Sequence, residues 1–350
     1  MTGGKERLKM ARRKKLVDDE VEDTQQDGGS YFASRPKHID FIKTGCTEFD
    51  CILGGGYVLG RMANIIGDSS TGKSLLCIEA CANFAAQYPD GDIYYVETEA
   101  AFDEEYAGAL GLPLDKVDLE RQVVTVEDWY EHLSAIIDRA TDDSPPILYI
   151  LDSLDSLSDR AELERKVDEG SYGANKAKKI SELFRRLNAK MSQKNVALII
   201  VSQVRENIGF GFGEKYKRSG GKALDFYASQ IVMLAQIKTE SRTINKIKRP
   251  VGTVIKAKVK KNKIAMPFRE AEFPLVFGYG IDDVTACLTY LKKVDHWDKE
   301  LGESPDSLKR KLASLPDDEY HDIGEKLSEL VRNHWYETEA NFIPKRRKYG

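Results

Sequence analysis

The sequence predicts an α/β protein built on a mostly parallel, twisted sheet with helices on both faces. Two observations carry this prediction. Fully apolar segments alternate with amphipathic ones between about residues 40 and 283, and a glycine-rich motif, G-x-x-x-x-G-K-[ST], stands at 67–74 between an apolar segment and a helical one. Strands that are apolar along their whole length are typical of parallel sheets, and the helices between them cover both faces.

Residues 1–39 precede this core as a polar arm. Its basic residues gather between 5 and 15, and its acidic residues gather between 18 and 23. Segregated charge of this kind is typical of a solvated tail, and it also suits an arm that docks on DNA or on a neighbouring subunit. Both interpretations stay open from the sequence.

The core, expected to span 40–283, divides into strands and helices by its hydrophobic pattern. The segment 253–263, TVIKAKVKKNK, alternates apolar and basic residues, which predicts an edge strand or a hairpin. Further strands are expected at 62–66, 92–98, 122–126, 147–151, 196–201 and 230–235, and helices are expected at 73–87, 127–140 and 173–193.

A small helical module is expected at 284–350. Glycine and proline interrupt helices, and Gly302, Pro305 and Pro316 divide this stretch into short amphipathic pieces. The chain then ends on a basic tail at 345–348. The three helices are expected at 286–293, 305–314 and 317–334.

Composition limits the classes of function. The formal net charge is -4 at pH 7, so a surface for nucleic acid has to be a local patch. No apolar run reaches the length of a membrane span, and the basic N-terminus lacks the apolar stretch of a secretory signal. The five cysteines form no C-x-x-C pair, and Cys77 and Cys81 share a helix face, which predicts packed thiols in a reducing, cytoplasmic compartment.

The motif at 67–74 reads GDSSTGKS and follows an apolar segment. Its two glycines let the backbone wrap so that N–H groups point at a phosphate, and the next helix adds the partial positive charge of its N-terminus. Lys73 is expected to reach the β- and γ-phosphates, and Ser74 to ligate Mg²⁺. The sequence thus predicts ATP and Mg²⁺ as cofactors, held by Gly67, Asp68, Ser69, Ser70, Thr71, Gly72, Lys73 and Ser74.

Carboxylates are expected beside this loop. Asp152 ends the apolar segment of PPILYILDS, where it can hold the hydration shell of Mg²⁺. Glu99 follows another apolar segment and can orient and deprotonate the attacking water, but Glu97 competes for this role and strand position does not decide between them. The residues alone predict an NTP-hydrolysing α/β domain and leave the purpose of hydrolysis open.

Five segments together resemble the bacterial RecA recombinases. They are GDSSTGKS, ETEAAFDEEYAGALG, ILDSLDSLSDRAELE, SQVRENIG…GGKALDFYAS and KVKKNKIAMPFREAEF, in that family's order and over roughly 40–283. The resemblance implies a RecA-like P-loop NTPase core and a DNA-dependent ATPase. It also implies helical self-assembly on single-stranded DNA, with ATP at each subunit boundary, and strand exchange with homologous duplex DNA in recombination and repair.

The resemblance also assigns roles to residues at the ATP site. It favours Glu99 over Glu97 as the residue that activates water. Gln203 matches the glutamine that senses the γ-phosphate. Asp103 and Tyr106 match the adenine contacts, with Tyr106 stacking on the base.

Other matched residues imply a site shared between subunits. Lys261 and Lys263 match a lysine pair that reaches the neighbouring subunit's phosphates, and Phe226 matches an aromatic residue at the subunit contact. Charge donated in trans stabilises the transition state only when subunits are stacked, which ties hydrolysis to assembly.

Two loops are expected to bind DNA, at about 164–178 and 203–221. In the second loop, basic residues can neutralise phosphates, apolar residues can wedge between bases, and glycines let the backbone follow DNA closely. The candidates are Tyr172, Gly173, Lys176 and Lys178 in the first loop, and Arg205, Asn207, Ile208, Gly209, Phe210, Phe212, Lys215, Lys217, Arg218, Gly220 and Gly221 in the second.

The chain departs from the bacterial pattern at both ends. Residues 1–35 do not match the family's assembly helix, and the tail at 345–348 is basic where the family usually carries an acidic tail. An acidic tail repels DNA, so its absence predicts weaker autoinhibition. Both a phage-encoded recombinase and a remote bacterial paralogue fit this divergence.

Two other functions compete with strand exchange. One is a non-recombining regulatory ATPase with the same fold, and the other is a ring helicase. The regulatory reading leaves Lys261, Lys263 and the loop at 205–221 without a purpose, and a helicase would carry an arginine finger in place of the lysine pair. Single-strand-binding or loader proteins are further expected partners of a recombinase, and no membrane partner is expected.

Overall fold

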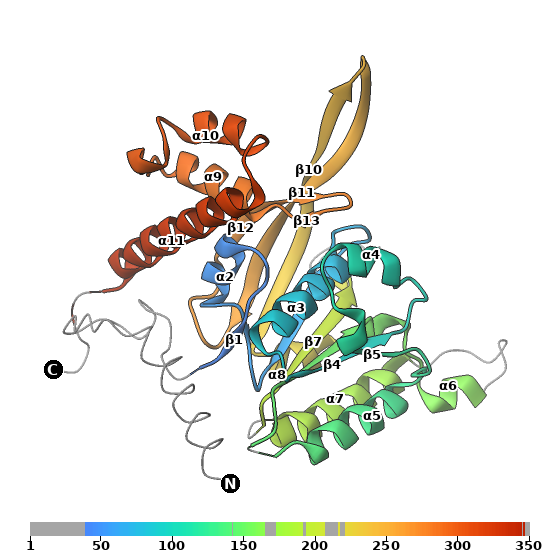
Figure 1. The fold of residues 1–350 in the computed structure, drawn as a ribbon. Coiled ribbons are helices and arrows are strands. Elements are labelled where there is room, and N and C mark those ends of the chain that lie inside the picture. Colours follow the sequence, from blue (N-terminus) through green and yellow to red (C-terminus); the bar gives the residue numbers. More distant parts are fainter. Residues whose placement is uncertain are drawn as a thin grey trace, which may run out of the picture.

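A computed structural model describes residues 39–141, 143–164, 173–191, 194–206, 216–217, 221–344 and 346. Its centre is a nine-stranded sheet with the order β13-β12-β11-β10-β3-β7-β6-β4-β5 (Figure 1). The strands are β3 (Met62–Gly67), β4 (Asp92–Glu97), β5 (Val117–Glu120), β6 (Ile147–Asp152), β7 (Val196–Gln203), β10 (Gln230–Ile244), β11 (Ile247–Asn262), β12 (Glu270–Val276) and β13 (Gly280–Ile281).

The sheet is parallel from β10 through β3, β7, β6 and β4 to β5, and antiparallel from β10 to β13. Alternate residues of β6 enter two separate apolar clusters: Leu148 packs on one side and Tyr149 on the other. The first cluster includes α2 (Thr47–Leu53) and α3 (Lys73–Gln87), and the second includes α5 (Val126–Arg139), α7 (Gly173–Met191) and α8 (Gly221–Tyr227). The predicted α/β architecture with helices on both faces is confirmed.

One strand prediction was wrong, and another was half right. Residues 122–126 were expected to form a strand, but the strand at this edge is β5, and 122–125 connect it to α5. Thr125 caps that helix, accepting a hydrogen bond from the N–H of Asp128 at 3.1 Å, so its polar side chain is used for capping and not for a sheet. For the segment 253–263, the hairpin alternative is confirmed and the edge-strand alternative is wrong: residues 253–262 lie in β11, which forms an antiparallel hairpin with β10 and has β12 on its other side.

Several short elements were not foreseen, because each is too short to show a hydrophobic period. They are β1 (Phe41–Ile42), β2 (Tyr57–Val58), α4 (Glu104–Ala109), α6 (Arg160–Glu164), β8 (Arg205–Glu206) and β9 (Tyr216–Lys217).

The C-terminal helices α9 (Asp283–Lys293), α10 (Pro305–Leu312) and α11 (Asp317–Phe342) share an apolar cluster of their own. Leu308, Leu327 and Val331 are buried in it, and Trp335 continues the same spacing. Because apolar residues recur every four positions on this face, α11 runs eight residues beyond the predicted end at 334.

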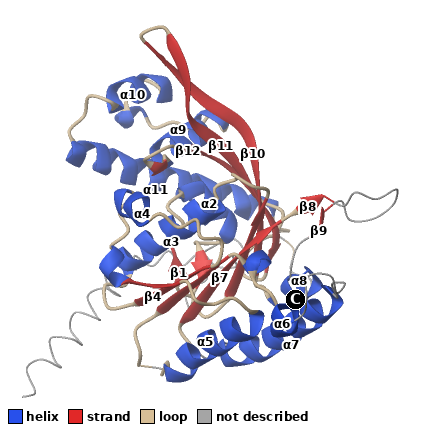
Figure 2. Ribbon diagram, turned by 90° about the vertical axis from the view of Figure 1, so that its right-hand side faces the viewer, coloured by secondary structure: helices blue, strands red, loops and turns tan. Residues whose placement is uncertain are grey.

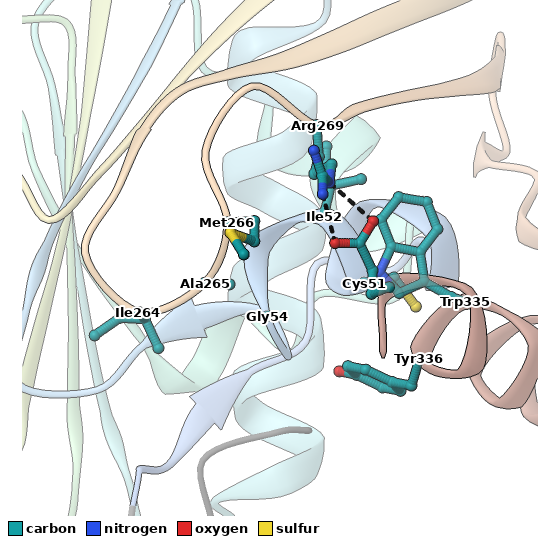
Figure 3. A pocket seen from close by; sticks show the side chains of 10 residues that line it. Cys51, Ile52, Gly54, Ile264, Ala265, Met266, Arg269, Trp335 and Tyr336 are labelled. Carbon is teal, nitrogen blue, oxygen red and sulfur yellow. Dashed lines mark hydrogen bonds and ion pairs between the residues drawn. The ribbon is translucent and has the colours of Figure 1, made fainter. Parts of the chain in front are cut away.

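An ion pair joins α11 to the core (Figure 3). The Nε and Nη2 atoms of Arg269 donate to the two carboxylate oxygens of Glu339 at 2.8 and 2.7 Å. Figure 3 shows this pair beside Cys51, Met266 and Trp335. The cavity among them holds about 20 Å³, which is room for about one water, so it is a packing gap.

All five cysteines are free and buried, as the sequence predicted. Among the helices of the described residues, none is long and apolar enough to cross a membrane.

Candidate ATP site and DNA-facing segments

The phosphate loop joins β3 to α3 and is shaped for an anion. Gly72 has φ +81°, in the left-handed region, and caps α3 without any side-chain hydrogen bond. The first N–H groups of α3 therefore have no side-chain cap and can meet a phosphate. A Cβ on Gly67 would lie 2.4 Å from Oγ1 of Thr71, so only glycine fits this tight turn.

Lys73 lies inside this loop. Its Nζ donates to the carbonyl oxygen of Asp68 at 2.7 Å, and burial lowers the pKa of its ammonium, an effect that Asp152 and Glu99 oppose. A hydrogen bond between the ammonium and a phosphate is charge-assisted, and it is stronger than the bond to a neutral carbonyl oxygen. A bound phosphate would therefore stabilise this partly desolvated ammonium more than the carbonyl oxygen of Asp68 does.

Asp152, at the end of β6, faces Ser74 at the start of α3. Its carboxylate accepts a hydrogen bond from Ser74 and another, at 2.8 Å, from the hydroxyl of Tyr95. Burial raises the pKa of Asp152. These oxygens suit Mg²⁺, which typically takes only one or two protein ligands beside substrate phosphates. Within the described ranges there is no group of three or more His, Cys, Asp or Glu that could hold a metal ion.

The structure separates the two competing glutamates. Glu97 is buried, and its Oε1 accepts the N–H groups of Glu99 and Ala101 at 2.8 and 3.0 Å, so it fixes the turn after β4. Glu99 is exposed, and its Oε1 accepts from Oγ of Ser153 at 2.5 Å and from Nε2 of Gln203 at 2.9 Å. Glu99 thus points where a water could reach it.

Gln203 ends β7 and is held at two points. Its side chain bonds Glu99, and its backbone N–H donates to Oδ2 of Asp155 at 2.7 Å. Strand β7 continues directly into the predicted DNA loop at 203–221. The carboxylate expected to activate water is therefore one hydrogen bond from the start of that loop.

A cavity of about 140 Å³ opens beside these groups. Asp103 caps α4, accepting from the N–H of Tyr106 at 3.0 Å. The cavity includes in its lining the residues predicted to bind Mg²⁺, Ser74 and Asp152, and those predicted to contact adenine, Asp103 and Tyr106. It is lined by Ser74, Leu75, Ile78, Tyr95, Glu97, Glu99, Ala101, Phe102, Asp103, Tyr106 and Asp152.

The predicted trans residues lie toward the opposite ends of the strands from the phosphate loop. Leu234 of β10 pairs with Gly67 at the phosphate-loop end, whereas Lys261 of β11 pairs with Ile231, nearer the amino ends of the parallel strands. Lys263 follows β11, and its N–H donates to the carbonyl oxygen of Ser229 at these same amino ends. The backbone of both lysines therefore lies nearer the amino ends of the parallel strands than the phosphate loop does.

Phe226 lies beside Lys261. Its side chain is 71% exposed, although it is aromatic, and it packs edge-to-face on Tyr227. Nζ of Lys261 donates to the carbonyl oxygens of Asp225 and Phe226 at 2.5 and 2.9 Å. Aromatic residues are enriched at protein interfaces, so this exposed ring suits a contact surface.

The two segments predicted to bind DNA are described in part. Lys176, in α7, donates to the carbonyl oxygen of Leu157, and Lys178 is exposed on the same helix. Arg205 of β8 pairs with Lys217 of β9, which makes a small ribbon at the base of the second loop. Gly173 and Gly221 begin α7 and α8, and the candidates Tyr172, Asn207, Ile208, Gly209, Phe210, Phe212, Lys215, Arg218 and Gly220 lie outside the described residues.

Three site residues escaped the sequence prediction: Tyr95, Ser153 and Asp155. Each touches a predicted residue only after folding, since Tyr95 meets Asp152 across two strands and Asp155 meets Gln203 across 48 residues. Ser153 and Asp155 follow Asp152 at the end of the same strand, and this clustering at a strand end was the available signal.

Comparison with known proteins adds the following. A family model for the RecA N-terminal domain matches residues 29–282. The chain is 33% identical over 316 residues to Protein RecA of Streptomyces venezuelae, an alignment that covers 86% of this chain and 80% of that protein. It is 32% identical over 290 residues to Protein RecA of Streptomyces coelicolor, an alignment that covers 80% of this chain and 74% of that protein. It is also 32% identical over 290 residues to Protein RecA of Leifsonia xyli, with 80% of this chain and 78% of that protein covered.

Proposed function

Because this chain belongs to the RecA family of recombinases, we propose that it hydrolyses ATP with Mg²⁺ while assembled as a filament on single-stranded DNA, and so drives strand exchange with homologous duplex DNA. The two competing functions, a regulatory ATPase and a ring helicase, are not favoured, since the curated relatives that cover most of the chain are named Protein RecA.

The main support for a filament is that the phosphate loop and the lysine pair lie on different parts of the chain's surface. The phosphate loop follows the carboxyl end of β3, whereas Lys261, Lys263 and Phe226 lie nearer the amino ends of the parallel strands. A contact between two different surfaces of the same chain is head-to-tail, and such contacts generate open helical assemblies when the rotation does not close a ring. Stacking copies in this way places one chain's lysines against the next chain's nucleotide.

Within this assembly, the residues divide the work of hydrolysis. Lys73 and the N–H groups of α3 would hold the phosphates, and Ser74 and Asp152 would hold Mg²⁺, which would supply positive charge beside the phosphate oxygens. Glu99 orients the attacking water and accepts its proton. The neighbour's Lys261 and Lys263 supply charge to the transition state, and Gln203 links the site to the DNA loop.

The division into an arm at 1–39, a core at 40–283 and a helical domain at 284–350 belongs to the same proposal. The separate apolar cluster of α9, α10 and α11 supports it. The five buried free thiols suit a reducing compartment, and hence action in the cytoplasm. A single-strand-binding or loader protein would act before assembly.

The test is strand exchange between homologous DNA molecules, run with ATP and with a non-hydrolysable analogue. We expect exchange, ATP hydrolysis stimulated by single-stranded DNA, and helical filaments by electron microscopy. Lys73→Ala should abolish all ATP-dependent steps, and Lys309→Ala, at an exposed position on α10, is the matched control. Protein that stays monomeric with ATP and a long oligonucleotide at low ionic strength would refute the proposal.

A further inference from the structure

Strands β10 and β11 extend beyond the sheet as a free two-stranded ribbon (Figures 1 and 2). The last β10 residue paired with β3 is Leu234, and β11 pairs with β12 only from Gly252 onward. Residues 235–240 pair with 252–256, which are themselves paired with β12, and 241–250 pair only with each other in the described structure. At about 3.4 Å per residue, this two-stranded part reaches roughly 15 Å beyond the sheet.

The ribbon is strongly basic. Residues 236–252 contain five basic side chains and one acidic side chain, Glu240, which pairs with Lys238 at 2.8 Å. The other four cations form no ion pair with any carboxylate of the described chain. They are Arg242, Lys246, Lys248 and Arg249.

The register gives one face of the tip a specific chemistry. Ile244 lies directly opposite Ile247, and Arg242 lies directly opposite Arg249. Because side chains two apart on a strand share a face, the apolar pair and the arginine pair lie side by side. The isoleucines are 61% and 54% exposed, so the apolar pair is open to a partner.

Two features of the tip oppose its own stability. Like charges directly opposite each other in an antiparallel pair are destabilising, and Arg242 and Arg249 are such a pair. The two-residue turn places Asn245 at φ +50° and Lys246 at φ +67°, a geometry in which glycine is strongly preferred at the second position. A cation stands there instead. A bound anion would reduce the repulsion between Arg242 and Arg249. It would also interact favourably with the charge of Lys246 in the turn.

We propose that this tip binds the sugar-phosphate backbone of duplex DNA, with Arg242 and Arg249 on phosphates and Ile244 and Ile247 against the wall of a groove. The inference rests on the proposed recombinase function. A two-stranded ribbon fits the major groove, and aliphatic side chains make apolar contacts in either groove.

Duplex DNA fits this surface better than a single strand does. Proteins hold unpaired bases on aromatic side chains, and 236–252 contain no aromatic residue. The ribbon is also separate from the predicted DNA loops. Figure 2 shows it projecting from the top of the molecule, whereas β8 and β9 project to the right.

The test uses filaments assembled on unlabelled single-stranded DNA with a slowly hydrolysed ATP analogue. A fluorescent duplex of unrelated sequence is added, and its affinity is measured by anisotropy over a range of salt concentrations. For Arg242→Gln/Arg249→Gln we expect the affinity to fall about tenfold, and the slope of log K against log salt to fall by about two, because two phosphate contacts are lost. Arg242→Lys/Arg249→Lys should keep most of the affinity.

The matched control is Arg185→Gln/Arg186→Gln, at two exposed positions on α7, which should bind duplex like the parent chain. Removing the opposed arginines should leave the thermal midpoint unchanged or raised, so a binding loss cannot come from unfolding. If the tip variant binds duplex as the control does, the inference is wrong.

A second copy of the chain is the competing occupant of the tip. In that case the tip variant would lose stimulation of hydrolysis by single-stranded DNA and form shorter filaments, which also overturns the inference. If the parent chain itself shows no such stimulation, the proposed function fails instead, so the two failures are distinguishable.

Discussion

The Nε2 atom of Gln203 donates a hydrogen bond to Oε1 of Glu99 at 2.9 Å, between residues 104 positions apart. The same oxygen of Glu99 accepts from Ser153, at the end of β6. One carboxylate is therefore held by the ends of two strands, and one of those strands leads into the predicted DNA loop. This arrangement offers a physical route from DNA binding to the activation of water.

The first prediction concerns this hydrogen bond. Gln203→Ala should keep hydrolysis without DNA near the parent rate and lose most of the stimulation by single-stranded DNA, since the side chain that links loop and carboxylate is gone. Steady-state hydrolysis with and without DNA measures both quantities. Gln122→Ala, at an exposed position, should behave like the parent. Full stimulation in Gln203→Ala would show that the coupling runs through other atoms.

The second prediction separates Glu99 from Glu97. Glu99→Gln should lower the hydrolysis rate on the order of 10²–10⁴-fold and leave ATP binding intact, because the general base is lost. Glu97→Gln should lower the free energy of unfolding by about 1 kcal/mol, since hydrogen bonds to an ionised acceptor are stronger than those to a neutral one. The readouts are single-turnover hydrolysis, nucleotide affinity and thermal melting. A larger loss of hydrolysis in Glu97→Gln would reverse the assignment.

The third prediction concerns the shared site. Lys261→Ala should bind ATP normally as a monomer and hydrolyse it slowly in filaments, by up to roughly 10³-fold if the lysine acts like an arginine finger. Mixed with an equal amount of Lys73→Ala, it should recover part of its activity, because roughly a quarter of random head-to-tail interfaces combine two intact halves.

Thermal melting is the control for the third prediction, since Lys261 also bonds carbonyl oxygens at the end of α8. A mixture no more active than the sum of its two separate components would contradict a site built from two chains.

The fourth prediction concerns pH. Burial raises the pKa of Glu79 from 4.5 to about 7, although its carboxylate accepts the N–H of Ile281 at 2.9 Å. The folded chain binds this proton more tightly than the unfolded chain, so the contribution to stability is full below pH 4.5 and is lost as the pH rises to about 7. The loss is at most roughly 3 kcal/mol.

Glu79→Gln keeps an oxygen for the N–H of Ile281 and has no proton to lose. Its thermal midpoint should exceed that of the parent by a few degrees at pH 8 and by much less at pH 5. An equal difference at both pH values would mean that Glu79 is not the titrating group.

Much of the fold could be read from hydrophobic pattern alone. The largely apolar runs that form β3 and β6 need burial on both faces whatever surrounds them, so the sequence predicts both strands within one residue. The edge strand β5 was missed because it is only four residues long and half-buried. The cap residue Thr125 was instead taken into a strand, since a β-branched residue among valines resembles one locally.

At the site, the phosphate loop follows from the sequence alone, because its chemistry depends on neighbours in the chain: two glycines, a lysine and a serine in a fixed spacing ahead of a helix. Three relationships need the folded chain: the exposure of Glu99 next to the buried Glu97, the hydrogen bond from Gln203 to Glu99, and the position of Lys261 toward the opposite strand ends from Gly67. These relationships join residues far apart in sequence. Hydrogen bonding and sheet register set them, and neither leaves a local pattern in the chain.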